Sequence, residues 1–228
     1  MFGKITDYKK ILFISMILAA FTALSFFLLF IGRMASLSSS ITEVLFKEKL
    51  KGDLNSIHKY IYEYYGSINS NADSLYDARW NSIGNDYTFI DRLKSELNVE
   101  ATIFIKQGLD FIRMTTTIVD PDGERAVGTT LGSSSEAYEY VSSGKSYIGK
   151  AHILGTEYLT GYQPIFASGN EIIGLVFIGV SLKEAQQHTA VIFRQAILWT
   201  GVTLVICIFI YSLFLLGIVL KLHGQHRK

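Results

Sequence analysis

Two uncharged apolar runs flank a long polar stretch, and this division dominates the hydropathy pattern of the chain. The first run, Ile11 to Gly32, has 22 residues, and the second, Ala196 to Leu220, has 25. A helix rises about 1.5 Å per residue, so each run is long enough to cross a hydrocarbon core of roughly 30 Å. The pattern predicts transmembrane helices at residues 11–33 and 196–220, with one domain at residues 34–195.

Basic residues concentrate in the two short tails. The first tail, residues 1–10, carries three lysines against Asp7, and the last, residues 221–228, carries three Lys or Arg and no acid. Residues 33–195 have 15 Lys and Arg against 19 Asp and Glu, a net charge of −4. The positive-inside rule therefore predicts that both termini are cytoplasmic and that the domain lies outside the membrane. The first run exceeds the usual signal-peptide core of about 7–15 residues, so we expect it to remain as an anchor.

Helical periodicity opens the domain, and strand-like sequence follows it. Apolar residues recur at helical spacing over residues 36–65, which predicts one long helix continuing the first span. Asp86 is the expected N-cap of a second helix. The remaining segments are assigned by residue type: strands at 99–106, 110–119, 145–154, 157–166 and 171–182, a short helix at 134–143, and an exit helix at 183–195.

This order of elements predicts an α+β fold with a mainly antiparallel sheet. Asp120-Pro121-Asp122-Gly123 has turn chemistry between two strand-like segments. Ile172 to Val180 is apolar on both faces, which is typical of a central strand covered on both sides.

Regular alternation along two strands would gather polar and aromatic side chains on one face each. These sets are Phe111, Arg113, Thr115 and Thr117 in one strand, and Tyr158, Thr160 and Tyr162 in another. A guanidinium can bind a carboxylate through two parallel hydrogen bonds, and aromatic walls exclude water. The sequence therefore predicts a site for a small anionic or zwitterionic solute. The candidate ligand-binding residues are Arg113, Thr115, Thr117, Arg125, Tyr138, Tyr147, Tyr158 and Tyr162.

Structural roles stay open for the same residues. Arg113 could pair with an acid or a helix C-terminus, and Arg125, after a turn, could hold a loop in place. The tyrosines could be core aromatics with one satisfied hydroxyl. Glycines in the strands, such as Gly149 and Gly179, could serve backbone geometry or the close approach of a ligand.

An ordered set of motifs resembles a known family. The set comprises residues 111–116 (FIRMTT), 122–131 (DGERAVGTTL), 144–149 (GKSYIG), 154–158 (LGTEY), 162–165 (YQPI) and 173–180 (IGLVFIGV). Over roughly residues 37–182 the chain resembles the single Cache sensor domain, of the type 3/type 2 fusion kind, of bacterial chemoreceptors and sensor kinases. This resemblance implies a PAS-like sheet with a long N-terminal helix, small-molecule sensing, and a bacterial inner membrane location with a periplasmic or extracellular domain.

The resemblance also implies a cytoplasmic output region after the second span, whereas eight residues follow it here. One interpretation is an input module that acts through a separate cytoplasmic signalling partner, and the other is a receptor remnant that binds or dimerises without its own output. Because the last strand leads directly into the second span, a ligand is expected to shift that helix by about 1–2 Å. A homodimer is expected, since two copies convert such a shift into a relative motion.

Other functional classes have weaker support. The histidines lack metal-ligand spacing, and neither a phosphate-binding loop nor a nucleophile elbow occurs in the sequence. No cofactor, metal or nucleic acid is expected, nor an enzymatic activity, because no acid, base and nucleophile set can be assembled. A membrane-anchored structural protein that dimerises through its long helix is the remaining alternative.

Overall fold

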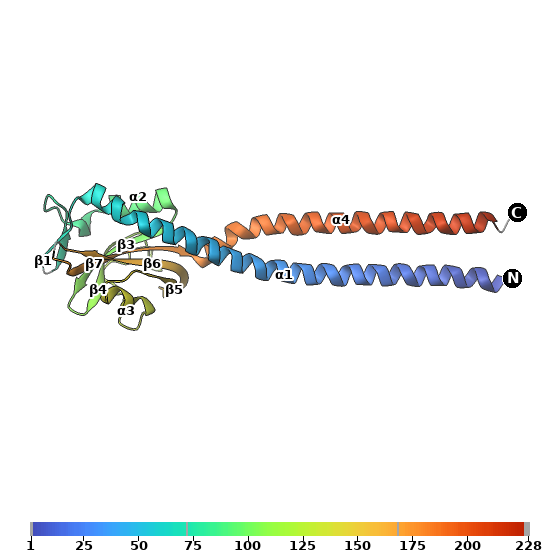
Figure 1. The fold of residues 1–228 in the computed structure, drawn as a ribbon, viewed down its shortest axis with the longest axis horizontal. Coiled ribbons are helices and arrows are strands. Elements are labelled where there is room, and N and C mark those ends of the chain that lie inside the picture. The colour runs from blue at the N-terminus through green and yellow to red at the C-terminus, as the bar shows by residue number, and fades with distance from the viewer. Residues whose placement is uncertain (1, 72, 168, 226–228) are drawn as a thin grey trace. The chain divides into compact units, whose positions relative to one another are not determined.

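The computed structural model describes residues 2–71, 73–167 and 169–225 (Figure 1). The chain divides into two compact units. Met1–Ser40 and Gln187–Lys228 form one unit, and Ile41–Gln186 form the other.

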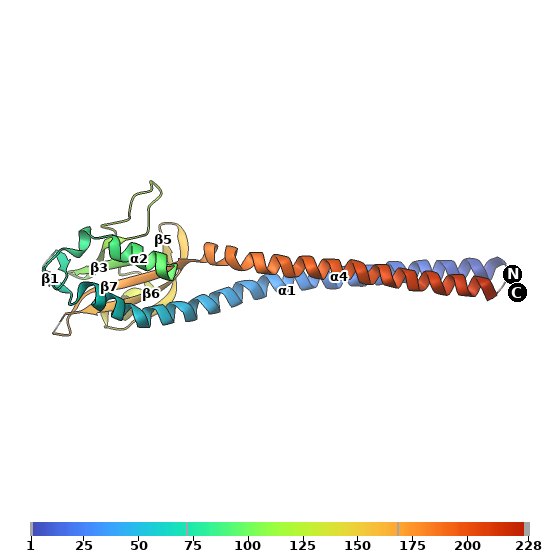
Figure 2. The ribbon, with the colours of Figure 1, turned by 90° about the horizontal axis from the view of Figure 1, so that it is seen from above.

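Two long helices supply the first unit. Helix α1 (Phe2–Tyr65) and helix α4 (Leu182–Gln225) lie side by side there (Figures 1 and 2). Both are long and apolar enough to cross a membrane, over Phe13–Tyr65 and Leu182–Lys221. The boundaries predicted near residues 33 and 195 fall inside continuous helices and stay predictions. The basic residues Arg227 and Lys228 lie outside the described residues.

A five-stranded antiparallel sheet forms the centre of the second unit, in the order β4-β3-β7-β6-β5. The strands are β3 (Glu100–Gln107), β4 (Asp110–Thr116), β5 (Tyr147–Ile153), β6 (Thr156–Phe166) and β7 (Ile172–Ser181). Strand β7 is central and buried from its second residue to its last, as its apolar sequence predicts. The expected α+β fold is confirmed.

Helices cover both faces of this sheet. Helices α1 and α2 (Thr88–Leu97) lie across one face, and α3 (Glu136–Ser142) lies on the other (Figure 1). Figure 2 looks onto the sheet from the side of α1 and α2. We call these faces the α1 face and the α3 face.

The α1 face contains the larger core. Buried residues of α1, such as Leu50 and Ile57, pack with Ile90 of α2 and Ile178 of β7. Gly161 allows this packing, because a Cβ there would lie 2.5 Å from Leu54 Cδ1. The glycine thus lets α1 approach β6 closely.

The α3 face carries a second, aromatic core. Phe104, Phe111 and Phe177 pack there with Ala137 and Val141 of α3. Ser135 caps the helix, since its Oγ accepts a hydrogen bond of 3.3 Å from the Ala137 backbone N–H. Gly144 follows it with φ 80°, a left-handed conformation that is common for glycine just after a helix.

The turn predicted at Asp120 is confirmed, whereas the predicted N-cap of α2 is wrong by one residue. The Gly123 N–H donates to Asp120 O at 3.1 Å, and Gly123 has φ 88°, as the predicted turn requires. Asp86 does not occupy the N-cap position of α2, which falls on Tyr87. The Asp86 carboxylate still accepts a hydrogen bond of 2.9 Å from Thr88 N–H, so it satisfies one free donor at the start of the helix. Short elements precede α2: β1 (Asn69–Asn71), β2 (Ser74–Tyr76) and the 3-10 helix η1 (Ile83–Asn85).

Candidate functional site

A β-bulge in β4 separates residues that the sequence places together. Arg113 pairs with Phe104 of β3, but Thr115 pairs with the adjacent Ile103, so Met114 is the extra residue. A bulge of this kind reverses the side on which the following residues lie. Arg113 therefore lies on the α3 face, and Thr115 lies on the α1 face with its Oγ1 donating to Asp86 O at 3.2 Å. The prediction that Arg113 and Thr115 share a face is wrong.

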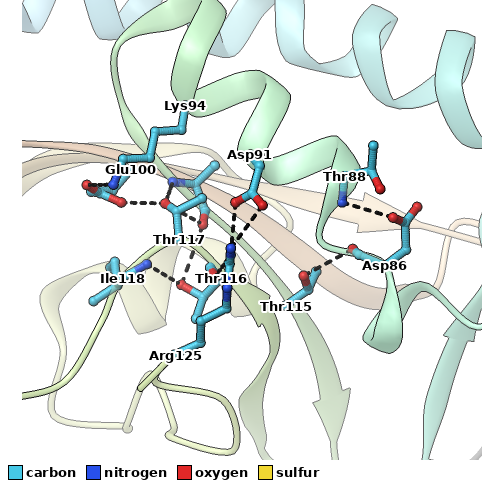
Figure 3. Close-up of polar contacts among 11 residues, drawn as sticks. Asp86, Thr88, Asp91, Lys94, Glu100, Thr115, Thr116, Thr117, Ile118 and Arg125 are labelled. Atoms are coloured by element: carbon cyan, nitrogen blue, oxygen red, sulfur yellow. Dashed lines mark hydrogen bonds and ion pairs between the residues drawn. The ribbon is translucent and has the colours of Figure 1, made fainter. Parts of the chain in front are cut away.

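Thr117 directly follows the last residue of β4. Its Oγ1 accepts a hydrogen bond of 2.8 Å from the Ala101 N–H and donates to the Glu100 carboxylate. Glu100 also pairs with Lys94 of α2 at 2.7 Å. Figure 3 shows Thr115 and Thr117 within this network of strand-end and α2 contacts. Both threonines are thus used by the fold, and their contact with a ligand stays a prediction.

Arg125 connects the loop after β4 to α2. Its two terminal nitrogens bind the two oxygens of Asp91, each at 2.9 Å, and Nη1 also donates to Thr116 O at 2.7 Å (Figure 3). The guanidinium carbon lies 4.4 Å from the centroid of the Tyr87 ring. This geometry favours the loop-holding alternative for Arg125 over ligand contact.

Arg113 has very different surroundings. The residue is 5% exposed, and its guanidinium carbon lies 5.1 Å from the centroid of the Phe104 ring. Nη1 donates to Thr129 Oγ1, whereas Nε is buried with no hydrogen-bond partner in the described part of the chain. None of the ion pairs formed by the described residues includes Arg113. Among the described residues, therefore, no carboxylate pairs with this buried cation of the α3 face.

Burial controls the electrostatics of this group. It lowers the pKa of Arg113, while the nearby phenols of Tyr162 and Tyr158 act in the opposite direction. Arginine still stays protonated at neutral pH because its ordinary pKa is above 12. An uncompensated buried charge costs free energy, and an anion bound beside it would offset that cost.

Three predicted tyrosines lie on the face where Arg113 lies. Tyr158 and Tyr162 share the α3 face of β6, as predicted, and Tyr147 of β5 pairs with Tyr162. The Tyr147 hydroxyl donates to Glu136 of α3 at 2.8 Å. Burial raises the pKa of Tyr147 and of Tyr162 to about 12 each, and it raises that of Tyr158. All three phenols are therefore neutral donors at physiological pH.

Tyr138 lies at the edge of this group. Its ring centroid is 6.2 Å from that of Phe111, and its hydroxyl donates to Leu109 O. The candidates thus separate into two sets. Arg113, Tyr147, Tyr158, Tyr162 and Tyr138 lie on the α3 face, and Thr115, Thr117 and Arg125 join β4 and its loop to the α2 side.

Two glycines support the aromatic residues of the α3 face. Gly149 and Gly179 flank Thr160 in register on neighbouring strands. A Cβ at Gly179 would lie 2.6 Å from Phe177 Cζ, and one at Gly149 would overlap the Tyr147 phenol. The rings of Phe177 and Tyr147 therefore lie over positions that have no side chain. These glycines serve close approach to the sheet, not a left-handed backbone.

Four further residues contribute to the α3 face, although residue type and spacing do not mark them as site residues: Phe104, Thr129, Glu136 and Phe177. Thr129 is held against Arg113 by the backbone, since Arg113 N–H donates to Thr129 O and Gly128 N–H donates to Arg113 O, both at 2.8 Å. A glycine followed by Thr129 and Thr130 is a weak strand-like signal that could have pointed to this pairing.

The α1 face has a groove of its own. It measures about 230 Å³ and lies between the end of α1 and the end of β6, lined by residues that include Ile57, His58, Pro164 and Phe166. None of its lining residues is Arg or Lys. The groove therefore offers apolar contact without a charged anchor, unlike the surroundings of Arg113. Among the described residues no group of three or more His, Cys, Asp or Glu could hold a metal ion.

The Cache 3/Cache 2 fusion domain model matches residues 41–206. The chain belongs to the Cache 3/Cache 2 fusion family. This match spans the second unit and continues into α4, so the resemblance inferred from the sequence motifs is confirmed. No curated protein matches the chain.

Solved structures also match the chain, at low sequence identity. The Escherichia coli DcuS sensor domain is 16% identical, covers 44% of this chain and 69% of its own, and has a TM-score of 0.36. The ligand-binding domain of the Campylobacter jejuni chemoreceptor Tlp3, in complex with L-valine, is 11% identical, covers 75% and 67% respectively, and has a TM-score of 0.42. The family match shows that the protein contains a Cache domain.

Proposed function

We propose that this Cache domain is the extracytoplasmic input module of a two-pass membrane receptor and that it binds a small solute through a carboxylate on Arg113. The observation that supports the proposal is the buried Nε–H of Arg113, which has no acceptor among the described residues. A carboxylate accepts parallel hydrogen bonds from a guanidinium and supplies the missing negative charge at the same time.

The surroundings of Arg113 suit such a ligand. The Phe104 ring supports the guanidinium from one side, and the neutral phenols of Tyr158 and Tyr162 lie close enough to interact electrostatically with it. A hydrogen bond between charged groups gains strength where water is excluded and the local dielectric is low. Arginine does not exchange protons at neutral pH, so its position favours binding over catalysis, and the proposal is a receptor rather than an enzyme.

A short path links this site to α4. Tyr158 pairs across the sheet with Ser181, the last residue of β7, and α4 begins at Leu182. Glu184 of the first turn of α4 and Glu100 both raise the pKa of Tyr158, while Arg113 lowers it. A solute that contacts Tyr158 therefore acts one residue away from the start of α4.

Ligand binding changes the receptor only through its differential affinity for two arrangements of the domain. We propose that the arrangement favoured by the ligand shifts α4 and that a homodimer passes this shift to a separate cytoplasmic partner. Both helices are long and apolar enough to span a membrane, which supports the two-pass topology. The basic tails support cytoplasmic termini.

A thermal-shift screen of the full-length protein in lipid nanodiscs tests the binding step. The probes are acetate, butyrate, benzoate, succinate, citrate and L-valine. At least one probe is expected to raise the unfolding temperature of the wild-type protein and to have no effect on Arg113→Met. The matched control is Arg79→Met, because Arg79 is an exposed arginine of the same domain. Stabilisation that persists in Arg113→Met would refute the assignment.

A further inference from the structure

We infer that the solute bound by Arg113 is a monocarboxylate with an uncharged, largely apolar body. This inference rests on the proposed function and specifies its ligand class. It follows from the charged groups near the guanidinium and from the partners that these groups already have.

Among the described residues, Arg113 is the only buried cation. Lys106 also lies on the α3 face by its register with Phe111, but it stands beyond Phe104 along β3. The guanidinium of Arg113 interacts instead with Tyr158 and Tyr162, which pair with Ser181 and Phe177 of β7 on the other side of Phe104. A second carboxylate on the ligand would therefore extend away from Lys106.

Acidic groups lie where that second carboxylate would go. Glu100 and Glu184 act on Tyr158, and Glu136 accepts the hydrogen bond of Tyr147. A dicarboxylate would place its second negative charge near these groups. Like charges in a partly buried site repel, so the geometry disfavours di- and tricarboxylates.

An ammonium group on the ligand would also lack a good partner. The Glu100 carboxylate already binds Lys94 at 2.7 Å and Thr117. Glu136 already accepts from Tyr147 at 2.8 Å, and Glu184 is exposed on α4. An ammonium would therefore lose hydration without gaining an unpaired buried carboxylate.

Aromatic rings line the α3 face beside Arg113. Tyr162 lies between Tyr147 and Phe177, with ring centroids 6.2 Å and 5.0 Å away. The latter two rings lie over Gly149 and Gly179, so their rotation would expose a surface of glycine backbone and Thr160. An apolar body would replace the contacts of these rings, and each added methylene is expected to tighten binding about fourfold until the space is filled.

Two pairs of matched probes test this inference by isothermal titration calorimetry on the full-length protein in nanodiscs. Succinate differs from butyrate by a carboxylate in place of the terminal methyl group, and L-valine differs from isovalerate by an ammonium. We expect butyrate to bind at least tenfold more tightly than succinate, and isovalerate at least tenfold more tightly than L-valine. Arg113→Met should abolish both interactions, and Lys106→Met should change neither by more than about twofold.

The alternative outcomes separate the inference from the proposed function. Succinate binding as tightly as butyrate, or L-valine as tightly as isovalerate, overturns the inference and leaves Arg113 as a carboxylate site. Failure of both butyrate and isovalerate to bind also overturns it, whichever other acid the Arg113 site accepts. If every probe that binds the wild-type protein binds Arg113→Met equally well, the proposed function itself is overturned.

Discussion

Replacing Arg113 with methionine should leave the ligand-free protein as stable as the wild type or more stable, although it removes a buried residue. The side chains are similar in length, so the change removes the charge while keeping most of the apolar contact. Arg113 has no carboxylate partner among the described residues, and its Nε is unsatisfied. The substitution therefore relieves an uncompensated burial cost.

The magnitude follows from the contacts that are lost and the cost that is removed. The variant loses the hydrogen bond to Thr129 and the contact with Phe104, together about 2–4 kcal/mol. It removes the burial of an unpaired charge, which costs several kcal/mol. The expected net change lies between zero and a gain of about 2 kcal/mol. Arg125→Met should instead lose about 1–2 kcal/mol, since Arg125 is two-thirds buried and binds Asp91 twice.

Scanning calorimetry of both variants in detergent provides the measurement. One kcal/mol corresponds to about 2–4 °C in unfolding temperature for a chain of this size. Arg113→Met is expected at or up to several degrees above the wild type, and Arg125→Met a few degrees below it. A fall of more than about 4 °C for Arg113→Met would show that its charge is compensated, and the reasoning about the site would be wrong.

Three further predictions concern the core, the site and the topology. Leu50→Ala should lower the free energy of unfolding by about 2–5 kcal/mol because Leu50 of α1 is fully buried in the core of the α1 face, whereas the exposed Leu109→Ala should change it by less than about 0.5 kcal/mol; urea titration compares the two. The pKa of Tyr147 rises from 10.0 to about 12 in the folded protein, so its contribution to stability is complete below pH 10 and is lost as the pH rises toward 12. In unfolding measurements from pH 9 to 12, Tyr147→Phe should lose less stability with rising pH than the wild type. The control Tyr62→Phe, at an exposed tyrosine, should behave like the wild type. In a Cys207→Ser background, a cysteine replacing Lys150 should react with a membrane-impermeant maleimide in intact cells, and one replacing Lys4 only after lysis; the reverse pattern would invert the proposed topology.

Most of the fold was predictable because its elements have strong periodic signals. The long helix, the five strands, the central position of β7 and the turn at Asp120 all follow from residue pattern and turn chemistry. These features depend on interactions within a few residues or on the burial of a whole segment. Local sequence is informative in such cases.

The bulge at Met114 was not predictable from the strand sequence. Residues 110–119 are β-branched and aromatic, as in a regular strand, and nothing in them indicates that one residue drops out of register. The bulge arises from pairing with β3, which sequence alternation does not report. The prediction that Arg113 and Thr115 share a face failed for this reason.

The sequence also could not show which of the two arginines is available to a ligand. Both were plausible anion ligands from residue type alone. Arg125 is neutralised by Asp91, which lies far away in the sequence, whereas Arg113 donates to the neutral hydroxyl of Thr129 and forms no ion pair with another described residue. Which arginine stays unpaired depends on tertiary contacts, and the structure was needed to distinguish them.

The Nε–H resonance of Arg113 provides the most direct measurement of the central claim that this group is a vacant donor for a carboxylate. Protein labelled with ¹⁵N-arginine gives the Nε–H correlation spectrum, and the signal missing from Arg113→Met identifies Arg113. On titration with a carboxylate that stabilises the protein, we expect this resonance to shift to the position of a charged hydrogen bond, while that of Arg125 stays in place. A carboxylate that binds and leaves the Arg113 resonance unchanged would contradict the account.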